Sequence, residues 1–184
     1  MLSPKRSRSV TAPLLRWVGG KQKLARALGP RIQSVLEGRI YVEPFLGAAS
    51  FFFNLAPASA VLSDTNALLI DCYRWVSLAP KKVWQALCPH IQRDSTHHYY
   101  QTRVAFNTGT NSVDQAARFI YLNRTCFNGV YRVNTNGAFN VPYGHKDHPS
   151  FPSEADLVST AKAFRTASLM CRSEERRVGK ECRL

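Results

Sequence analysis

The stretch Arg39-Ile-Tyr-Val-Glu-Pro-Phe-Leu-Gly47 predicts a short buried strand that ends in a proline-glycine turn. Residues 48–55 are rich in alanine and phenylalanine and predict the helix that follows. Residues 60–63 then predict a second strand, which ends at Asp64. A strand, a glycine turn, a helix and a second strand form a βαβ unit, which implies a parallel sheet with a right-handed crossover. The sequence therefore predicts an α/β fold.

Apolar residues at helical spacing predict further helices on both sides of this unit. Before it, we expect a helix within residues 20–36. After it, the expected helices cover residues 67–78, 81–91, 99–107 and 113–122. Two strands followed by a run of helices and a glycine-rich ribbon predict an inserted helical module, roughly residues 69–149.

The segment from Phe119 to Arg132, together with residues 137–144, combines aromatic, arginine and asparagine side chains with glycines. We expect a short, turn-rich loop or ribbon that buries little of itself. Its rings can wedge between or stack on bases, its arginines match guanine edges or phosphates, and its amides can pair with adenine. An ordinary hairpin whose aromatic residues fill a local core is the alternative.

The charge balance favours a polyanionic partner. The chain has 184 residues, a formal net charge of +13 and 45% hydrophobic residues, enough for a real core. Residues 1–12 form a basic arm that no apolar stretch follows, so we expect neither a signal peptide nor a membrane anchor. The five cysteines form no Cys-x-x-Cys pair and no metal spacing with the histidines, so we expect no metal and a reducing compartment.

The turn after the first strand lies where an α/β sheet binds a nucleotide-like ligand. Gly47 would let the backbone approach that ligand, and Asp64 stands where a carboxylate accepts hydrogen bonds from ribose hydroxyls. Glu43 is harder to explain as packing, and its carboxylate could hold an ammonium group such as that of a methionine moiety. No second phosphate-cradling glycine is present, so S-adenosylmethionine fits this turn better than a dinucleotide.

A second candidate site is the stretch Arg16-Trp-Val-Gly-Gly-Lys21. Its two glycines allow a tight turn, and Trp17 and Lys21 can then face one pocket. A buried tryptophan beside a solvated lysine at a helix start is the alternative explanation from spacing alone.

Five motifs, taken in order, resemble those of Dam-like DNA adenine-N6 methyltransferases. They are Arg16-Trp-Val-Gly-Gly-Lys21, Val42-Glu-Pro-Phe-Leu-Gly47, Ser63-Asp-Thr-Asn66, Leu122-Asn-Arg-Thr-Cys-Phe-Asn-Gly129 and Phe139-Asn-Val-Pro-Tyr-Gly144. The resemblance runs from about residue 13 to residue 171. It implies a Rossmann-like S-adenosylmethionine-dependent domain (residues 13–68 and 150–171) with an inserted helical target-recognition domain (residues 69–149).

The resemblance also implies an activity and a set of site residues. The activity is methyl transfer from S-adenosylmethionine to N6 of a flipped adenine in double-stranded DNA, in the bacterial or phage-infected cytoplasm at the nucleoid. For the recognition sequence, the resemblance suggests a GATC-like site. The implied cofactor contacts are Trp17, Lys21 and Asp64, with Glu43 and Gly47 on the methionine side. The implied DNA contacts are Phe127 and Asn128 as a wedge, Arg132 at a base edge, and Arg16 and Arg124.

The sequence departs from the family pattern in three places. It contains no Pro-Pro pair, so the Asp-Pro-Pro-Tyr catalytic loop is absent and we expect the chain alone to be inactive. Ala49 stands where the family often has glycine. Residues 172–184 resemble a translated sequencing adapter, and we expect them to be a non-native tail on a chain cut near Cys171, a solvated natural helix end being the alternative.

Two other functions remain open from the sequence. A non-catalytic DNA-binding module would keep the ribbon, but it has no need of the pocket that Trp17 implies. An RNA adenine methyltransferase relative is disfavoured only by the resemblance of the ribbon.

Overall fold

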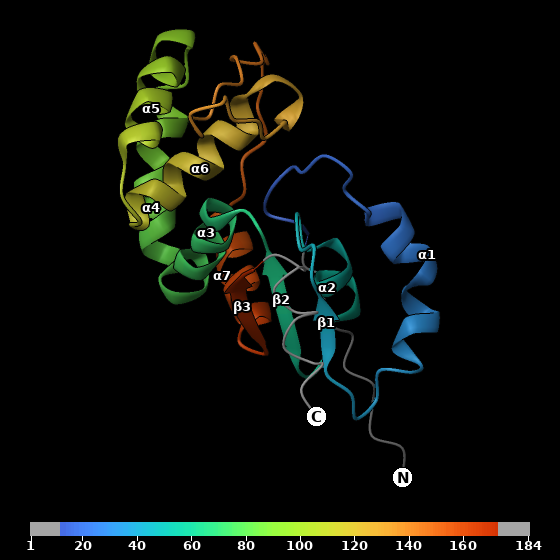
Figure 1. Ribbon diagram of the computed structural model, residues 1–184. Coiled ribbons are helices and arrows are strands. Elements are labelled where there is room, and N and C mark those ends of the chain that lie inside the picture. Colours follow the sequence, from blue (N-terminus) through green and yellow to red (C-terminus); the bar gives the residue numbers. More distant parts are fainter. Residues whose placement is uncertain (1–11, 173–184) are drawn as a thin grey trace.

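Three parallel strands form the sheet in the computed structural model, which describes residues 12–172 (Figure 1). The strands are β1 (Tyr41–Glu43), β2 (Ala60–Asp64) and β3 (Ala167–Cys171), with β2 in the middle. Ala60 on β2 pairs with Tyr41 on one side and with Ala167 on the other. The predicted βαβ unit and its parallel sheet are therefore confirmed, and β3 adds a strand that the sequence had not indicated.

Seven α-helices accompany the sheet within residues 12–172. They are α1 (Gln22–Gln33), α2 (Ser50–Leu55), α3 (Ala67–Leu78), α4 (Pro80–Gln92), α5 (Thr96–Thr108), α6 (Val113–Thr125) and α7 (Glu154–Phe164). Polar side chains cap four of them: Asn66, Ser95, Ser112 and Ser153 each accept a backbone N–H of the first turn. The α2 helix begins two residues later than expected because Ala49 is left-handed, with φ of +55°.

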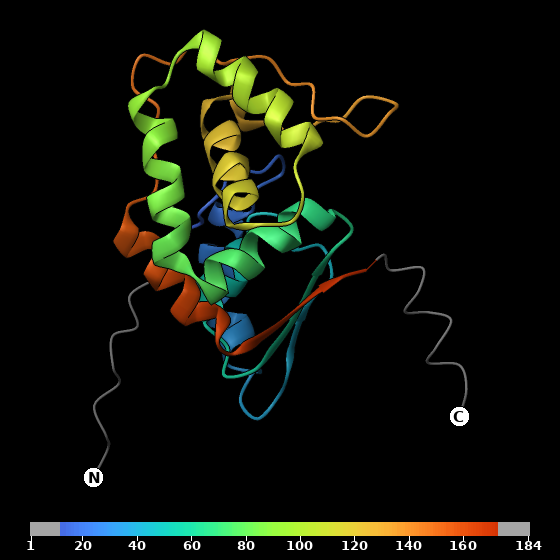
Figure 2. The same cartoon turned by 90° about the vertical axis from the view of Figure 1, so that its left-hand side faces the viewer.

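The core has one centre beneath the sheet and another among the long helices. Phe164 on α7 stacks on Phe52 of α2 with ring centroids 5.4 Å apart and contacts Tyr73 of α3 at 5.1 Å, so these three helices meet on one face of the sheet. Tyr99 and Tyr121 are fully buried where α5 packs on α6. Figures 1 and 2 show α4, α5 and α6 extending away from the sheet as a helical unit.

The segment predicted as an exposed ribbon divides into two parts. Residues 119–125 are the last two turns of α6 and are mostly buried, so the expectation that this half buries little of itself is wrong. The physical reason is that its apolar side chains sit at helical spacing and face the core. Antiparallel bridges join Cys126 to Tyr143, just before the short helix η1 (Phe127–Gly129), and Val133 to Phe139 after it. This ribbon, residues 126–144, projects from the helices in Figure 2.

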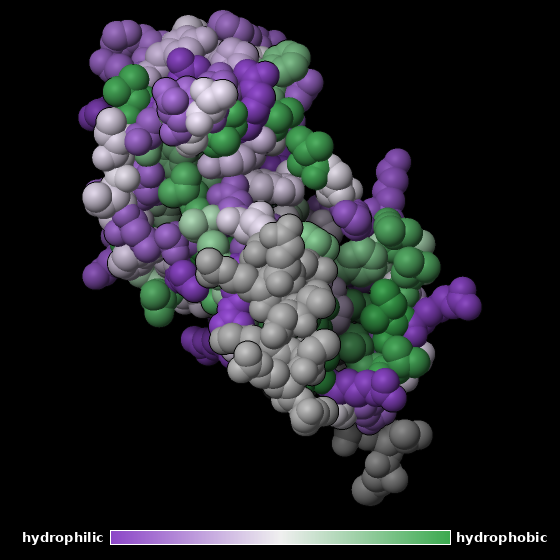
Figure 3. Space-filling model, viewed as in Figure 1, coloured by the Kyte–Doolittle hydropathy of each residue, from purple (hydrophilic) through white to green (hydrophobic). Residues whose placement is uncertain are grey.

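The outer face of α1 carries apolar side chains at the surface. This helix buries only Ala25 and Gly29, whereas Leu24 is 46% exposed and Leu28 is 37% exposed. Figure 3 shows a hydrophobic region on the side of the molecule where Figure 1 places α1.

Two segments named from the sequence fall largely outside the described residues. They are the basic arm of residues 1–12 and the expected non-native tail of residues 172–184. No helix within residues 12–172 is long and apolar enough to cross a membrane. The same part of the chain holds no group of three histidine, cysteine or acidic side chains arranged to bind a metal ion.

Candidate functional site

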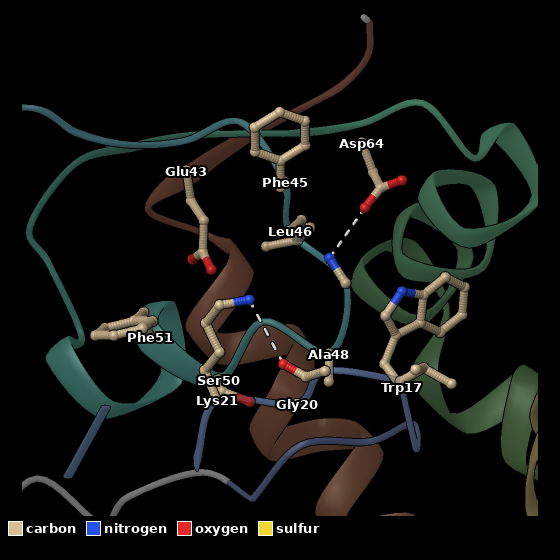
Figure 4. Close-up of a pocket in the computed structure, with 13 residues that line it drawn as sticks. Trp17, Gly20, Lys21, Glu43, Phe45, Leu46, Ala48, Ser50, Phe51 and Asp64 are labelled. Atoms are coloured by element: carbon tan, nitrogen blue, oxygen red, sulfur yellow. Dashed lines mark hydrogen bonds between the residues drawn. The ribbon is translucent and has the colours of Figure 1, made fainter. Parts of the chain in front are cut away.

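A pocket of about 250 Å³ lies at the carboxyl ends of β1 and β2 (Figure 4). Its walls are the loop before α1, the turn after β1 and the end of β2. The structure brings all five predicted cofactor residues to this pocket: Trp17, Lys21, Glu43, Gly47 and Asp64. The topology explains this convergence, because parallel strands present their carboxyl ends at the same edge of a sheet.

Asp64 fixes the turn that forms the floor of the pocket. Its Oδ2 accepts the Gly47 N–H at 3.0 Å, and its Oδ1 accepts the Asn66 N–H at 3.0 Å. The buried Tyr73 hydroxyl donates to the Gly47 carbonyl at 2.9 Å. Both backbone groups of Gly47 are therefore held in place. A carboxylate oxygen has two lone pairs, so Asp64 keeps acceptor capacity toward the pocket.

Glu43 is a half-buried carboxyl group in the wall of the pocket. Burial raises its pKa to about 7, against the partial opposition of the Tyr41 hydroxyl, the Phe52 N–H and the charge of Lys21. The hydroxyl and the N–H donate to Oε2 at 3.1 and 3.2 Å. Figure 4 shows Glu43 and Lys21 directed toward the same part of the pocket. The anionic form of Glu43 is thus poorly stabilised, and a positively charged ligand would favour it.

Trp17 forms the wall between the pocket and the ribbon. Its ring stacks on Tyr131 with centroids 5.6 Å apart and an interplanar angle of 18°, and it lies 6.3 Å from the ring of Phe119. On its other side, a Cβ at Gly47 would stand 2.8 Å from Trp17 Cδ1. One aromatic side chain therefore lies against the turn of the pocket, α6 and Tyr131 of the ribbon.

The loop that carries Trp17 is fastened to α6 by Asn123. The Asn123 amide accepts the Arg16 N–H at 2.8 Å and donates to the Arg16 carbonyl at 2.7 Å, and this asparagine is 5% exposed. The side chain of Arg16 itself is exposed and lies over Gly129, where an added Cβ would stand 2.7 Å from Arg16 Cβ. The loop is therefore positioned by the helical unit as well as by the sheet.

A second, more open cavity of about 650 Å³ borders the same loop. Trp17, Gly20 and Ser50 line both cavities, and Arg16, Lys23 and Arg124 give the second one a basic wall. The Ser50 hydroxyl is buried and has no hydrogen-bond partner among the described residues.

The five predicted DNA-binding residues are not equally placed. Phe127 is 54% exposed, and Asn128 is exposed with a left-handed φ of +51°. Arg132 is exposed on the ribbon. By contrast, the Arg124 guanidinium donates to the carbonyls of Pro13 and Leu14, and burial lowers its pKa. Holding that segment accounts for Arg124 by itself, and its contact with DNA stays a prediction.

Sequence reasoning missed several residues that shape this region. Asn123, Tyr131, Asn140 and Lys146 were not singled out, although Lys146 donates to the carbonyls of Arg124 and Cys126 at the end of α6. The one available signal was the position of Asn123 inside an apolar helix, where an amide needs a partner.

The fold and the pocket define an α/β protein with a cavity at the carboxyl edge of a parallel sheet. Residues 17–181 match the family model for D12 class N6 adenine-specific DNA methyltransferase, and the chain belongs to this family. The match reaches into the segment expected to be a non-native tail.

Curated relatives agree with this family. Type II methyltransferase M1.LlaDCHI of Lactococcus lactis subsp. cremoris is 34% identical over 163 residues, covering 85% of this chain and 56% of that protein. Type II methyltransferase M.MjaIII of Methanocaldococcus jannaschii is 33% identical over 176 residues, covering 86% and 61%. A DNA adenine methylase of Salmonella typhi is 37% identical over 161 residues, covering 86% and 56%. The chain spans about three fifths or less of the length of these relatives.

Proposed function

We propose that this chain is the cofactor-binding and target-recognition part of an enzyme that methylates N6 of adenine in double-stranded DNA. The observation that carries the proposal is the single pocket that unites Trp17, Lys21, Glu43, Gly47 and Asp64 in a member of this family. The finer fold assignment belongs to the same proposal: a Rossmann-like cofactor domain with residues 69–149 as the inserted recognition domain.

The groups around the pocket fit S-adenosylmethionine. Asp64 retains acceptor capacity for ribose hydroxyls, and Trp17 offers a ring edge and face to an apolar or aromatic portion of a ligand. Glu43, with its pKa raised to about 7, is suited to the ammonium of a methionine group. The bound donor would supply an electrophilic methyl group on a sulfonium.

The residues of this chain contribute binding and orientation to the chemistry. During transfer, the adenine N6 lone pair forms a bond to the methyl carbon, the carbon–sulfur bond breaks, and one proton leaves N6. That lone pair is delocalised into the ring, so the base must be flipped out and aligned before it can react. The sequence has no Asp-Pro-Pro-Tyr loop to accept the N6 protons, so we assign no proton transfer to its residues.

The projecting ribbon supplies the contacts for base flipping in this proposal. Phe127 and Asn128 stand exposed on η1, where an aromatic side chain can enter between base pairs. Arg132 is placed to read a base edge, and Arg16 extends from the loop beside the pocket to contact the backbone. Together they put DNA next to the cofactor pocket.

Calorimetry with S-adenosylmethionine and S-adenosylhomocysteine tests the cofactor assignment. We expect binding of both, and an affinity at least about tenfold lower in Asp64→Ala because two backbone N–H groups lose their acceptor. Asp71→Ala is the matched control, since this carboxylate pairs with Arg74 on α3 and does not line the pocket. Absence of binding heat in the wild type, or equal affinities in the two variants, contradicts the proposal.

The substrate is tested on the whole enzyme that contains this chain. Transfer of a labelled methyl group is measured on duplex DNA and on RNA of the same sequence. We expect label on N6 of adenine in DNA only. Transfer to RNA would favour the RNA-modifying alternative, and DNA binding without any transfer or cofactor binding would favour a simple binding module.

A further inference from the structure

Arg132 and Asn140 face each other across the ribbon. Arg132 Nε donates to Asn140 Oδ1 at 2.8 Å, and the Asn140 N–H donates to the Arg132 carbonyl at 3.1 Å. One bond joins the backbones and the other joins the side chains. The position of the guanidinium is therefore set by the residue opposite it on the ribbon.

The residues that precede Arg132 and Asn140 on the two sides of the ribbon are both held by tertiary contacts. Tyr131, just before Arg132, stacks on Trp17 and contacts the tilted ring of Phe139, with centroids 5.6 Å apart in each pair. Phe139, just before Asn140, is 4% exposed, and both of its backbone groups bond to the Asn107 amide at 2.8 and 3.0 Å. Exposed Arg132 and half-buried Asn140 thus follow anchored neighbours, which reduces the freedom that Arg132 has to lose when it binds.

The contact with Asn140 determines which edge of the Arg132 guanidinium is available. With Nε engaged, Nη1 and Nη2 remain for a ligand, and this end of the fork matches the O6 and N7 acceptors of guanine. Asn140 is neutral, and the only ion pair among residues 12–172 joins Asp71 to Arg74. Arg132 is therefore oriented by an amide that leaves its positive charge intact.

We propose that Asn140 is a positioning residue that sets the base preference of this protein by orienting Arg132 toward a guanine edge. The inference rests on the proposed function, because it requires the ribbon to meet DNA. It predicts that specificity and affinity separate in suitable variants: an amide orients the arginine, whereas a carboxylate would orient it but repel phosphates.

Selection from short duplexes with a randomised centre tests the inference. The chain is incubated with this pool and S-adenosylhomocysteine, bound duplexes are separated by electrophoresis, and their sequences are compared with the starting pool. We expect wild type to enrich guanine at one position and Arg132→Ala to lose that enrichment. Asn140→Ala should lower the guanine preference by about 3- to 10-fold while binding of the unselected pool stays the same.

Asn140→Asp should have the opposite effect to Asn140→Ala: it should lower affinity and keep the guanine preference. It keeps an acceptor for Nε, so the guanine preference should persist, while affinity for every duplex falls because a negative charge is added beside the phosphates. Replacing the enriched guanine by 7-deazaguanine, which lacks the N7 acceptor, should weaken wild type and Asn140→Asp strongly and Asn140→Ala little. Asn136→Ala, which removes an amide at the tip of the ribbon, is the matched control and should behave as wild type.

The outcomes distinguish failure of the proposed role of Asn140 from failure of the proposed function. If Arg132→Ala loses guanine while Asn140→Ala keeps the full preference, the role of Asn140 is wrong and the proposed function stands. If wild type enriches no sequence, both fail. Should Asn140→Ala not fold, Asn140→Ser removes the same contact with a polar side chain, and the 7-deazaguanine comparison on that variant distinguishes the same outcomes.

Discussion

Gly47 has a φ of +47°, a backbone conformation that L side chains rarely adopt, and an added Cβ would stand only 2.8 Å from Trp17 Cδ1. We expect Gly47→Ala to push the Trp17 ring out of the wall of the pocket. Affinity for S-adenosylhomocysteine should then fall at least about tenfold, about 1.4 kcal/mol. Isothermal titration calorimetry with S-adenosylhomocysteine measures the change in affinity.

Gly137→Ala is the matched control for this effect. Gly137 is also left-handed, with φ of +77°, but nothing lies within 4 Å of its added Cβ. Both variants introduce the same kind of backbone strain, and only one meets an aromatic ring. Equal losses of ligand affinity in the two variants would show that backbone strain, rather than contact with Trp17, is responsible.

Glu43 makes the stability of the fold depend on pH. Its pKa is about 7 in the folded chain against an ordinary value of 4.5, so folding favours the protonated acid. Its contribution to the free energy of unfolding is therefore fully present below about pH 4.5 and is lost as the pH rises through 7. The change is at most about 3 kcal/mol. Urea unfolding of wild type and Glu43→Gln from pH 4.5 to 8 measures it as the difference between the two proteins.

The raised pKa of Glu43 also makes the affinity for S-adenosylmethionine depend on pH. A bound ammonium group favours ionised Glu43, so binding releases a proton and affinity for S-adenosylmethionine should rise between pH 6 and 8. The rise should be absent in Glu43→Gln. A rise of equal size in this variant would place the titrating group elsewhere.

At the scale of elements, asparagines on α5 and α6 hold two loops by the same device. Asn123 bonds both backbone groups of Arg16, and Asn107 bonds both backbone groups of Phe139. We expect Asn123→Ala to lower the free energy of unfolding by about 1–3 kcal/mol, because paired backbone groups lose their partners. It should also weaken cofactor binding, since the Arg16 loop carries Trp17. Urea unfolding and calorimetry on the same samples measure both effects.

Asn107→Ala separates stability from ligand affinity. It removes an equivalent clamp from the ribbon, so it should destabilise the chain comparably and leave cofactor affinity unchanged. If Asn107→Ala weakens the cofactor as much as Asn123→Ala does, the two losses reflect general destabilisation.

The sequence predicted elements well where local patterns decide them. The α3 helix covers the predicted residues 67–78, because its apolar spacing and its cap at Asn66 act within a few residues. The sequence did not predict α7 or β3. The β3 strand forms by pairing with β2, which lies about a hundred residues earlier in the chain. The ribbon was misjudged in its first half because aromatic composition does not say whether Phe119 faces the core or the solvent.

The candidate site follows the same division. The positions of Glu43, Gly47 and Asp64 could be predicted because strand ends converge at one edge of a parallel sheet. Asn123 and Tyr131 could not, because their partners Arg16 and Trp17 lie more than a hundred residues away in the chain. The local sequence pattern is therefore enough to identify the residues at the floor of the pocket. The residues that hold Trp17 in its wall can be identified only from tertiary contacts.

At the scale of the whole molecule, a net charge of +13 would give the proposed DNA binding a large electrostatic component. We expect the logarithm of the association constant to fall linearly with the logarithm of salt concentration, and Arg16→Ala to reduce the slope by about 1 with little change in thermal midpoint. Arg124→Ala should instead lower the thermal midpoint and leave the salt slope unchanged, because its guanidinium donates to the carbonyls of Pro13 and Leu14. Fluorescence anisotropy across a salt series and thermal unfolding measure the two quantities, and a lower salt slope in Arg124→Ala would show that this arginine reaches a phosphate as well.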